Sequence, residues 1–392
     1  MKYFFVLGNN PTLSAAELTA VLNFSQAKLL APNFLVGETS HEPHLQSLIK
    51  RLGGTIKLGE LIAEVPFSSN FADFLPSLEK IILQHSNNLG AGKINFGFSV
   101  YGDQQINTKA LGLTIKKKLQ AQGISSRLVT SQEKTLSSVV VEQNKLLKRG
   151  LEIVLIREGG KIIIGKTLAV QDFKGLSRRD YGRPARDDHS GMLPPKLAQI
   201  MLNLAELTDP QEIIVDPFCG SGTILSEALL MGYQRLFGSD LIPQAVSNTR
   251  ENIAWLKKNY PLDNSQVKII TKNVINLAKF IKPLSASAIV TEPYLGPQRG
   301  LINFNQVKGN LESLYSEALA QFRLVLKPGG RVVMIWPSFY GERPITPDYS
   351  GFKMLNPYPS FMSSPLNKNR PSIIYGRPGQ KVFREIVVLE KE

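Results

Sequence analysis

The chain has 392 residues, of which 43% are hydrophobic and 20% are charged, a composition typical of a folded protein rather than a disordered or fibrous one. Its length predicts two or three domains, because a single hydrophobic core seldom grows that large. One cysteine, Cys219, and four scattered histidines exclude an internal disulfide and a structural zinc site. No apolar run approaches the roughly 18 residues of a membrane span, and the apolar start is too short for a signal peptide. We therefore expect a cytoplasmic protein without a metal or a membrane partner.

Residues 1–68 are predicted to form a ferredoxin-like module. A strand at 2–8 precedes a helix, for which Ser14 and Glu17 have the spacing of an N-terminal capping box. The order βαββαβ is completed by two strands, a helix and a strand, at 26–30, 34–38, 43–52 and 55–65.

Residues 69–171 are predicted to form a second α/β domain, which is basic. Residues 93–190 contain 18 Lys and Arg against 9 Asp and Glu, in a chain whose net charge is +14. This excess indicates a polyanionic partner, although a solvated basic face would give the same counts. The polar residues 172–190 are interpreted as a linker or a contact loop. The elements expected in this domain are helices at 71–85 and 106–121, strands at 94–100 and 127–129, and a hairpin of 151–156 with 161–170.

Residues 191–392 change to strands that alternate with helices, which predicts a parallel sheet built from βαβ units. The expected strands lie at 212–216, 235–240, 267–271, 288–291 and 331–336, with a closing hairpin of 372–376 and 382–390.

An acidic residue and a glycine turn follow the first of these strands, in the segment Asp216-Pro217-Phe218-Cys219-Gly220-Ser221-Gly222-Thr223. No lysine follows the last glycine, and Leu225 stands where the dinucleotide fingerprint has its third glycine, so neither phosphate-binding loop fits. An Asp at this edge suits a cofactor with a cationic amino-acid end, such as S-adenosylmethionine. Asp240 ends the next strand, where its carboxylate can accept both ribose hydroxyls. Each Asp alone would also suit a cap or a turn, but their order on successive strands favours a cofactor site.

Glu292, Pro293 and Tyr294 end the fourth strand at the same edge of the sheet. Methylation of an exocyclic base amine needs acceptors that hold the nitrogen as it becomes tetrahedral, and the Glu292 carboxylate with the Pro293 carbonyl would supply them. Tyr294 would stack on the base once the base has left its helix. The alternative is a surface Glu and a core Tyr. Cys219 lies inside the glycine turn, so attack on a pyrimidine by a cysteine nucleophile is disfavoured.

The segment 192–392 resembles the amino-methyltransferases of the class I S-adenosylmethionine-dependent group, on the evidence of the cofactor loop, Asp240 and the turn Leu326-Lys327-Pro328-Gly329-Gly330-Arg331. The whole chain is similar to the THUMP-domain tRNA guanosine-N2 methyltransferases of the archaeal and eukaryotic type, whose linker resembles Arg178-Arg179-Asp180-Tyr181-Gly182-Arg183-Pro184 and the segment 191–198. The implied domains are a ferredoxin-like module (1–68), an RNA-binding THUMP domain (69–171), a linker (172–190) and a Rossmann-like methyltransferase domain (191–392). The implied cofactor residues are Pro194, Asp216, Pro217, Gly220, Gly222, Thr223, Asp240, Leu241 and Asn273, and the candidate RNA contacts are Lys116, Lys117, Lys118, Arg178, Arg179 and Arg183.

This resemblance implies methylation of guanosine at tRNA position ten by one chain, with S-adenosylmethionine as methyl donor and no protein partner required. The chain departs from the family's acceptor motif Asp-Pro-Pro-Tyr, because the ungapped fit reads Glu292-Pro293-Tyr294-Leu295. Alternative hypotheses are a methyltransferase for the guanine N2 of rRNA or the adenine N6 of DNA, and an RNA-binding protein that retains the fold without turnover.

Overall fold

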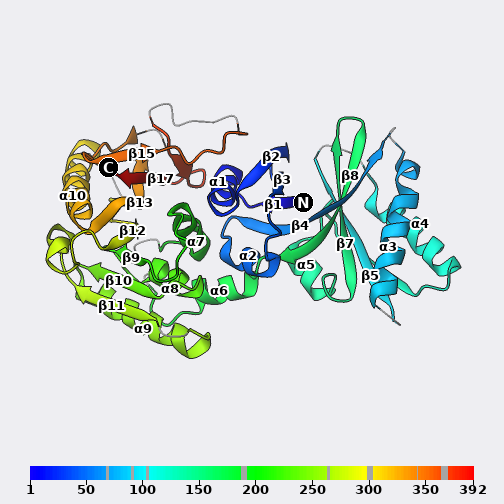
Figure 1. The fold of residues 1–392 in the computed structure, drawn as a ribbon, viewed down its shortest axis with the longest axis horizontal. Coiled ribbons are helices and arrows are strands. Elements are labelled where there is room, and N and C mark those ends of the chain that lie inside the picture. The colour runs from blue at the N-terminus through cyan, green and yellow to red at the C-terminus, as the bar shows by residue number, and fades with distance from the viewer. Residues whose placement is uncertain are drawn as a thin grey trace. The chain divides into compact units, whose positions relative to one another are not determined.

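A computed structural model describes residues 1–67, 70–89, 92–102, 106–186, 192–262, 265–297, 303–341, 343–362 and 370–392. The chain forms two compact units (Figure 1). The first consists of Met1–Pro11, Leu22–Lys50 and Thr55–Phe173, and the second of Thr12–Val21, Arg51–Gly54 and Lys174–Glu392. Two short segments near the N-terminus therefore belong to the second unit. Among the described residues, no helix is both long and apolar enough to cross a membrane.

One mixed sheet of eight strands organises the first unit, in the order β2-β3-β1-β4-β8-β7-β5-β6. Its first four strands form the antiparallel part expected of a ferredoxin-like module. Strand β4 also pairs antiparallel with β8, so the sheet continues without interruption into the later strands. The strands are β1 (Lys2–Leu7), β2 (Phe24–Ala31), β3 (Phe34–Thr39), β4 (Thr55–Pro66), β5 (Ile94–Tyr101), β6 (Ser126–Val129), β7 (Gly150–Glu158) and β8 (Lys161–Val170).

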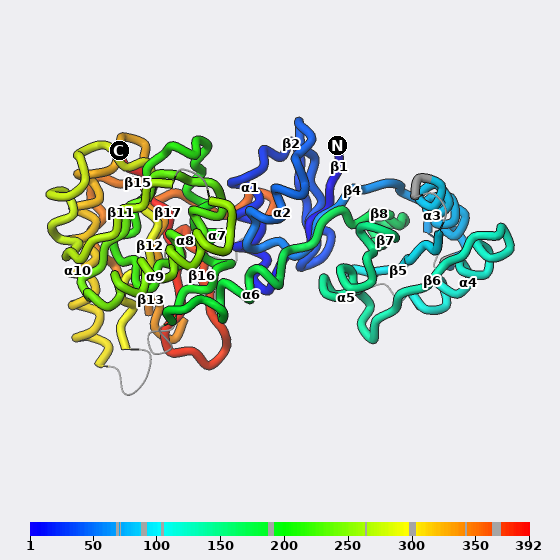
Figure 2. Tube along the Cα trace, turned by 90° about the horizontal axis from the view of Figure 1, so that it is seen from below, coloured from blue at the N-terminus to red at the C-terminus, as the bar shows by residue number. Residues whose placement is uncertain are grey.

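Helices α3 and α4 pack beside each other on the strands β5, β6 and β7 (Figures 1 and 2). Their apolar residues recur at helical spacing, and the buried ones meet the inward-facing residues of these strands in one core. The helices associated with the first unit are α2 (Leu45–Arg51), the short 3₁₀ turn η1 (Phe71–Asp73), α3 (Leu75–Leu89), α4 (Thr108–Ala121) and α5 (Ser138–Gln143). The sequence interpretation omitted α5.

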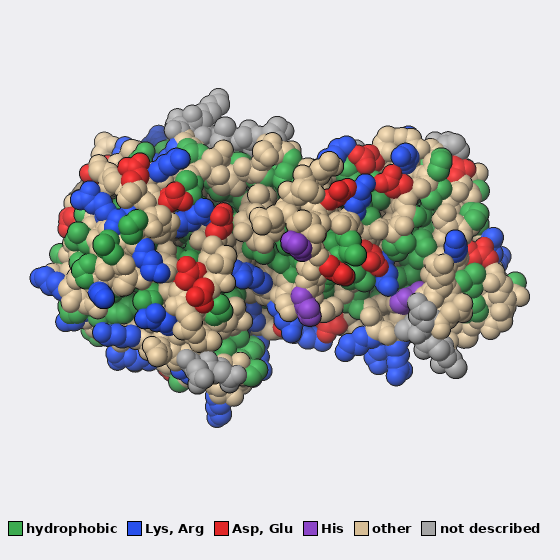
Figure 3. All heavy atoms as spheres, viewed as in Figure 1, with side chains coloured by type: hydrophobic (Ala, Val, Ile, Leu, Met, Phe, Trp, Pro, Cys, Tyr) green, Lys and Arg blue, Asp and Glu red, His purple; other side chains and the backbone are tan. Residues whose placement is uncertain are grey.

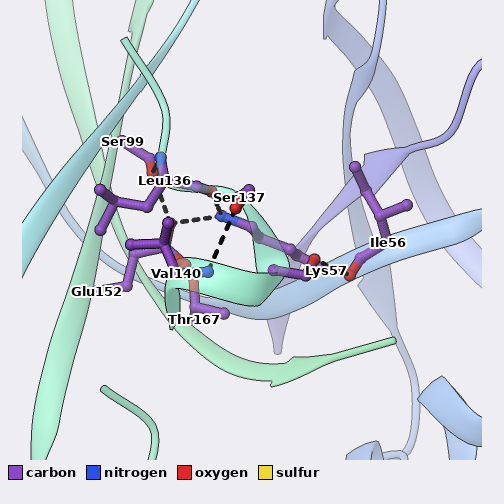
Figure 4. Close-up of polar contacts among 9 residues, drawn as sticks. Ile56, Lys57, Ser99, Leu136, Ser137, Val140, Glu152 and Thr167 are labelled. Atoms are coloured by element: carbon purple, nitrogen blue, oxygen red, sulfur yellow. Dashed lines mark hydrogen bonds and ion pairs between the residues drawn. The ribbon is translucent and has the colours of Figure 1, made fainter. Parts of the chain in front are cut away.

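A buried ion pair lies inside the first unit (Figure 4). The Lys57 ammonium donates to Glu152 Oε1 at 2.6 Å, and Glu152 also accepts from the hydroxyls of Ser99 and Thr167. Lys57 and the Ser99 hydroxyl further bind the backbone of Leu136, just before α5. Because both charges are paired and hydrogen-bonded, the desolvation cost of burying them is offset.

Helix α1 (Pro11–Val21) begins at Pro11 rather than at the predicted cap Ser14, which is buried within the helix. Pro suits the first turn, where a backbone N–H has no helical partner. Glu17 does not close a capping box, because its carboxylate accepts from the N–H groups of Gly53 and Gly54, both at 2.8 Å, and from Asn203 Nδ2 at 2.7 Å. The prediction of a capping box was therefore wrong, and Glu17 ties three distant segments of the second unit together.

The second unit is built on a sheet in the order β11-β10-β9-β12-β13-β17-β15, in which β14 pairs with β13 and β16 with β17. The pairs from β11 to β13 are parallel, and β17 runs antiparallel to β13, β15 and β16. The strands are β9 (Ile213–Asp216), β10 (Arg235–Asp240), β11 (Gln266–Thr271), β12 (Ala286–Thr291), β13 (Leu326–Phe339), β14 (Arg343–Pro344), β15 (Phe352–Leu355), β16 (Ile373–Tyr375) and β17 (Val382–Lys391).

The helices of the second unit confirm the predicted alternation of strands and helices. Helices α7, α8 and α9 pack against one another in succession, while α10 packs against η2 and β13. The linker expected at 172–190 is largely helical, and its residues 187–190, with Gly191, lie outside the described residues. Besides α1, these helices are α6 (Phe173–Tyr181), α7 (Pro195–Leu204), α8 (Thr223–Leu230), α9 (Pro243–Asn259), η2 (Val274–Lys279) and α10 (Phe304–Val325).

Candidate active site

The predicted cofactor and acceptor residues follow the carboxyl ends of three adjacent parallel strands. Strand β9 lies between β10 and β12, so the strand order reverses at β9. In open α/β sheets, ligands bind at the carboxyl edge where such a reversal opens a crevice. The structure therefore places Asp216, Asp240 and Glu292 at one edge of one sheet.

The glycine turn after β9 adopts a backbone that other residues rarely adopt. Gly220 and Gly222 have φ angles of 52° and 81°. A Cβ added to Gly220 would meet no atom within 4 Å, whereas one on Gly222 would lie 2.7 Å from Thr249 Cγ2. The turn thus leaves open space at Gly220 and packs tightly against α9 at Gly222.

Two side chains of α9 hold this turn in place. Thr249 Oγ1 donates to the Gly220 carbonyl at 2.7 Å, and Asn252 Nδ2 donates to the Ser221 carbonyl at 2.8 Å. Sequence reasoning missed both residues, because neither a motif nor a periodic pattern marks a polar residue on the inner face of a helix.

Asp216 is fully buried at the end of β9. Its Oδ1 accepts from Thr291 Oγ1 at 2.7 Å and from the Phe218 N–H at 3.3 Å. Burial, together with the negative charges of Asp240 and Glu292, raises the pKa of Asp216 to about 7, although the hydrogen bonds from Thr291 and Phe218 act to lower it. A buried carboxyl with a raised pKa favours a positively charged ligand, because a nearby cation offsets the effects of burial and of the neighbouring negative charges.

Asp240 and Asn273 organise the neighbouring backbone. Asp240 Oδ2 accepts from the Gly220 N–H at 3.0 Å and Oδ1 from the Ile242 N–H at 3.0 Å. Asn273 caps η2 by accepting from the Ile275 N–H at 3.2 Å. These contacts attach Asp240 to the glycine turn, while the ribose and adenine contacts of the two residues stay predictions.

Glu292 forms an ion pair with Arg384 of β17. Arg384 Nε donates to Glu292 Oε1 at 2.6 Å, and the two side chains are 16% and 15% exposed. Burial raises the pKa of Glu292, while the Arg384 guanidinium acts to lower it. The arginine thus favours the ionised carboxylate in a partly buried place, and 92 residues separate it from Glu292 in the sequence.

The rest of the acceptor motif is fixed by α10. The buried Tyr315 hydroxyl donates to the Tyr294 carbonyl at 3.0 Å, while the Tyr294 side chain is 63% exposed. Pro293, which lies between Glu292 and Tyr294 in the sequence, is buried. The motif therefore combines a held backbone with an aromatic side chain that is accessible from solvent.

Cys219 is buried inside the glycine turn, as the sequence predicts. Burial raises the pKa of its thiol well above the ordinary value, so the nucleophilic thiolate is disfavoured. Within the described ranges, no three His, Cys, Asp or Glu side chains form a group that would hold a metal ion.

The candidate RNA contacts fall into two groups. Lys116 and Lys117 are exposed on α4, while Lys118 pairs with Glu79 at 2.8 Å. Arg178 is exposed and lies 5.7 Å from the centre of the Trp255 ring. On the face shown in Figure 3, basic side chains are interspersed with acidic ones in both units.

Arg179 and Arg183 are occupied inside the second unit. Arg179 donates to both carboxylate oxygens of Glu227, at 2.7 and 3.0 Å. Arg183 is 6% exposed and donates to Thr223 Oγ1 at 2.6 Å. The guanidinium groups of both arginines are turned into the protein and hydrogen-bonded there, so this structure does not present them to an RNA phosphate.

Comparisons with known proteins fit this geometry. A family model described as an RMKL-like methyltransferase domain matches residues 183–339, and one described as DNA methylase matches residues 99–251. The crystal structure of TrmN from Thermus thermophilus has a TM-score of 0.55 and 20% sequence identity, with 100% of both chains covered. This similarity shows that the two proteins share a fold.

Three archaeal relatives share a name. The tRNA (guanine(10)-N2)-dimethyltransferase of Methanothermobacter thermautotrophicus is 32% identical over 53% of this chain, which spans 58% of that relative's length. Its counterpart from Pyrococcus abyssi is 26% identical over 94% of this chain and 98% of its own length. A probable tRNA (guanine(10)-N2)-dimethyltransferase of Methanothermococcus thermolithotrophicus is 32% identical over 31% of this chain and 69% of its own length.

Proposed function

We propose that this chain, which belongs to the tRNA (guanine(10)-N2)-dimethyltransferase family, transfers methyl groups from S-adenosylmethionine to the exocyclic N2 of a guanosine in tRNA. The observation that carries the proposal is the arrangement of Asp216, Asp240 and Glu292 at one edge of the parallel sheet, around a glycine turn that is open at Gly220. This arrangement suits a cationic nucleoside cofactor beside an amine acceptor.

The residues at the edge of the sheet fit S-adenosylmethionine, which supplies an activated methyl group on a positively charged sulfur. Asp216 provides a buried carboxyl with a raised pKa, which a nearby cation would favour in its ionised form. Asp240 ends the adjacent strand β10, where it would accept from the ribose hydroxyls. The open space at Gly220 admits a ligand close to the backbone.

Glu292 and Pro293 would hold the acceptor amine. The Glu292 carboxylate, whose ionised form Arg384 favours, would accept a hydrogen bond from the N2 amine and take its proton as the nitrogen gains the methyl group. The Pro293 carbonyl accepts the second hydrogen and holds the nitrogen in the geometry of attack. Tyr294, exposed beside them, would stack on the displaced guanine.

Unit one would bind the tRNA as a THUMP-containing module, through phosphate and shape contacts that include Lys116 and Lys117. The proposal extends to guanosine ten as the target and to action by a single chain, as the names of the relatives suggest. A tRNA substrate would place the reaction in the cytoplasm.

The test is incubation of the protein with S-adenosylmethionine and unmodified tRNA, followed by nucleoside mass spectrometry. We expect N2-methylguanosine or its dimethyl form, and a loss of about 10²–10⁴-fold in rate for Glu292→Gln, which cannot take a proton. Glu251→Gln, at an exposed carboxylate on α9, is the matched control. Cofactor and tRNA binding without any methylated nucleoside would favour the non-catalytic RNA-binding alternative.

The match to a DNA methylase model favours adenine N6 of DNA as a second candidate substrate. That match begins in β5 and ends in α9, before β12 and its acceptor motif, so it bears on the cofactor loop rather than on the substrate. Parallel incubations with DNA and with rRNA, digested to nucleosides, separate N6-methyladenine and rRNA N2-methylguanine from the tRNA product.

A further inference from the structure

Arg183 is a buried cation whose hydrogen bonds go to neutral groups. It is 6% exposed, and its guanidinium donates to Thr223 Oγ1 at 2.6 Å and to the Met192 sulfur at 2.8 Å. Its Nε has no hydrogen-bond partner within the described part of the chain. A buried charge is ordinarily paired with an opposite charge, since the loss of hydration is costly.

The acidic groups around Arg183 leave it incompletely neutralised. Glu227 and Asp180 act on it favourably and Arg186 unfavourably. Both oxygens of Glu227 are already bound by Arg179. Among the described residues, the buried Arg183 and the mostly buried Arg179 therefore share one buried carboxylate, that of Glu227, and the charge of Arg183 lies beside Thr223.

Thr223 is the first residue of α8, directly after the glycine turn. No side chain caps this helix, because its N-cap residue is Gly222, and the first N–H groups of a helix have no partner within the helix. The Thr223 oxygen accepts from Arg183, so the hydroxyl proton is left to donate elsewhere. Helix start, hydroxyl donor and buried cation together favour an anion at this place.

The small cavity beside Arg183 decides how the arginine acts. It is lined by Arg179, Arg183, Thr223 and Asn252 among others, and its volume is about 10 Å³, which is room for one water molecule at most. A carboxylate does not fit there. Arg183 therefore acts on a bound anion through Thr223 and through its charge, rather than by direct contact.

We propose that Arg183 is a positioning residue for the carboxylate of the methionine end of S-adenosylmethionine, which Thr223 binds at the start of α8. This inference rests on the proposed function and deepens it. The acidic residues at the strand ends would bind the cationic and nucleoside parts of the cofactor. Arg183 would supply positive charge near the carboxylate, which is the cofactor's one anionic group. Arg183 then takes part in cofactor recognition rather than in the expected contact with an RNA phosphate.

The test compares two ligands by calorimetry on the full chain. S-adenosylmethionine has the carboxylate, and decarboxylated S-adenosylmethionine lacks it but keeps the ammonium and sulfonium groups. We expect Arg183→Gln to weaken binding of S-adenosylmethionine about tenfold or more, and to change binding of the decarboxylated ligand less than about twofold. Arg183→Lys, which keeps the charge, should restore part of the loss. Arg235→Gln, at an exposed arginine that begins β10, is the matched control and should change neither affinity.

Thr223→Val should show the same preference for losing the carboxylate ligand, and the double variant should lose less than the sum of the two single losses. If Arg183→Gln does not fold, Thr223→Val alone tests the inference. Equal weakening of both ligands, or weakening of neither, would overturn the inference while leaving the proposed function intact. A wild-type protein that binds neither ligand would instead contradict the proposed function itself.

Discussion

Removal of Arg384 should change the pH dependence of methyl transfer, because Arg384 favours the ionised form of Glu292. Burial already raises the pKa of Glu292, and the guanidinium 2.6 Å away opposes that rise. An opposite charge at such a distance typically shifts a carboxyl pKa by about 1–3 units. In Arg384→Gln, we therefore expect the pKa of Glu292 to rise further by about that amount.

Methyl transfer requires the ionised carboxylate in the proposed mechanism, so the acid limb of kcat/KM should move to higher pH by about 1–3 units. Below the new pKa, activity should fall about tenfold per unit, and it should recover towards pH 9. The assay is transfer of labelled methyl groups to tRNA between pH 5.5 and 9.5. Arg377→Gln, at an exposed arginine before β17, controls for general damage. A uniform loss of activity with an unshifted acid limb would refute the reasoning.

Gly53→Ala should destabilise the second unit by about 1–3 kcal/mol or more, since the new Cβ would lie 2.0 Å from a backbone carbonyl oxygen of α7. Gly309→Ala, at an exposed position within α10, should instead stabilise the protein by about 0.5–1 kcal/mol. Urea unfolding measures both, and effects of the same sign would contradict the packing described. Glu152→Gln should lower the free energy of unfolding by about 3–5 kcal/mol, because it leaves the Lys57 ammonium buried without a counter-charge. A Lys57→Met/Glu152→Leu double variant that is no more stable than Glu152→Gln would argue against this cause. Affinity for S-adenosylmethionine should fall by up to about tenfold per pH unit below pH 7, because Asp216 must lose its proton to face a cation. Calorimetry that finds the same affinity from pH 5 to pH 8 would exclude this coupling.

The sequence predicts those parts of the site that are local. Asp216, Asp240 and Glu292 each directly end or follow an apolar strand, so a short pattern is enough to place all three at the edge of a parallel sheet. The partner of Glu292 was not predictable in this way. Arg384 lies on an antiparallel strand 92 residues away, and only the pairing of β13 with β17 brings it near.

Local patterns also gave a wrong prediction where a side chain binds a segment that is far away in the sequence. Ser14 and Glu17 have the spacing of a capping box, but Glu17 is buried and binds the backbone of Gly53 and Gly54. Charge counts identified Arg179 and Arg183 as basic without showing that both are turned inwards. Spacing and composition carry no information on burial, which depends on contacts between segments far apart in the sequence.

The contact between Glu17 and Asn203 has a consequence for the order of events during synthesis. These residues are 186 positions apart, and both belong to the second unit. At the usual 5–20 residues per second, a ribosome needs roughly 10–40 s to extend the chain from the first to the second. Helix α1 is therefore among the first segments to leave the ribosome, yet it must wait for α7 before its buried face is covered. During that interval its apolar residues, such as Leu13, are exposed to other chains, so the nascent protein would depend on rapid translation or on a chaperone more than its finished stability suggests.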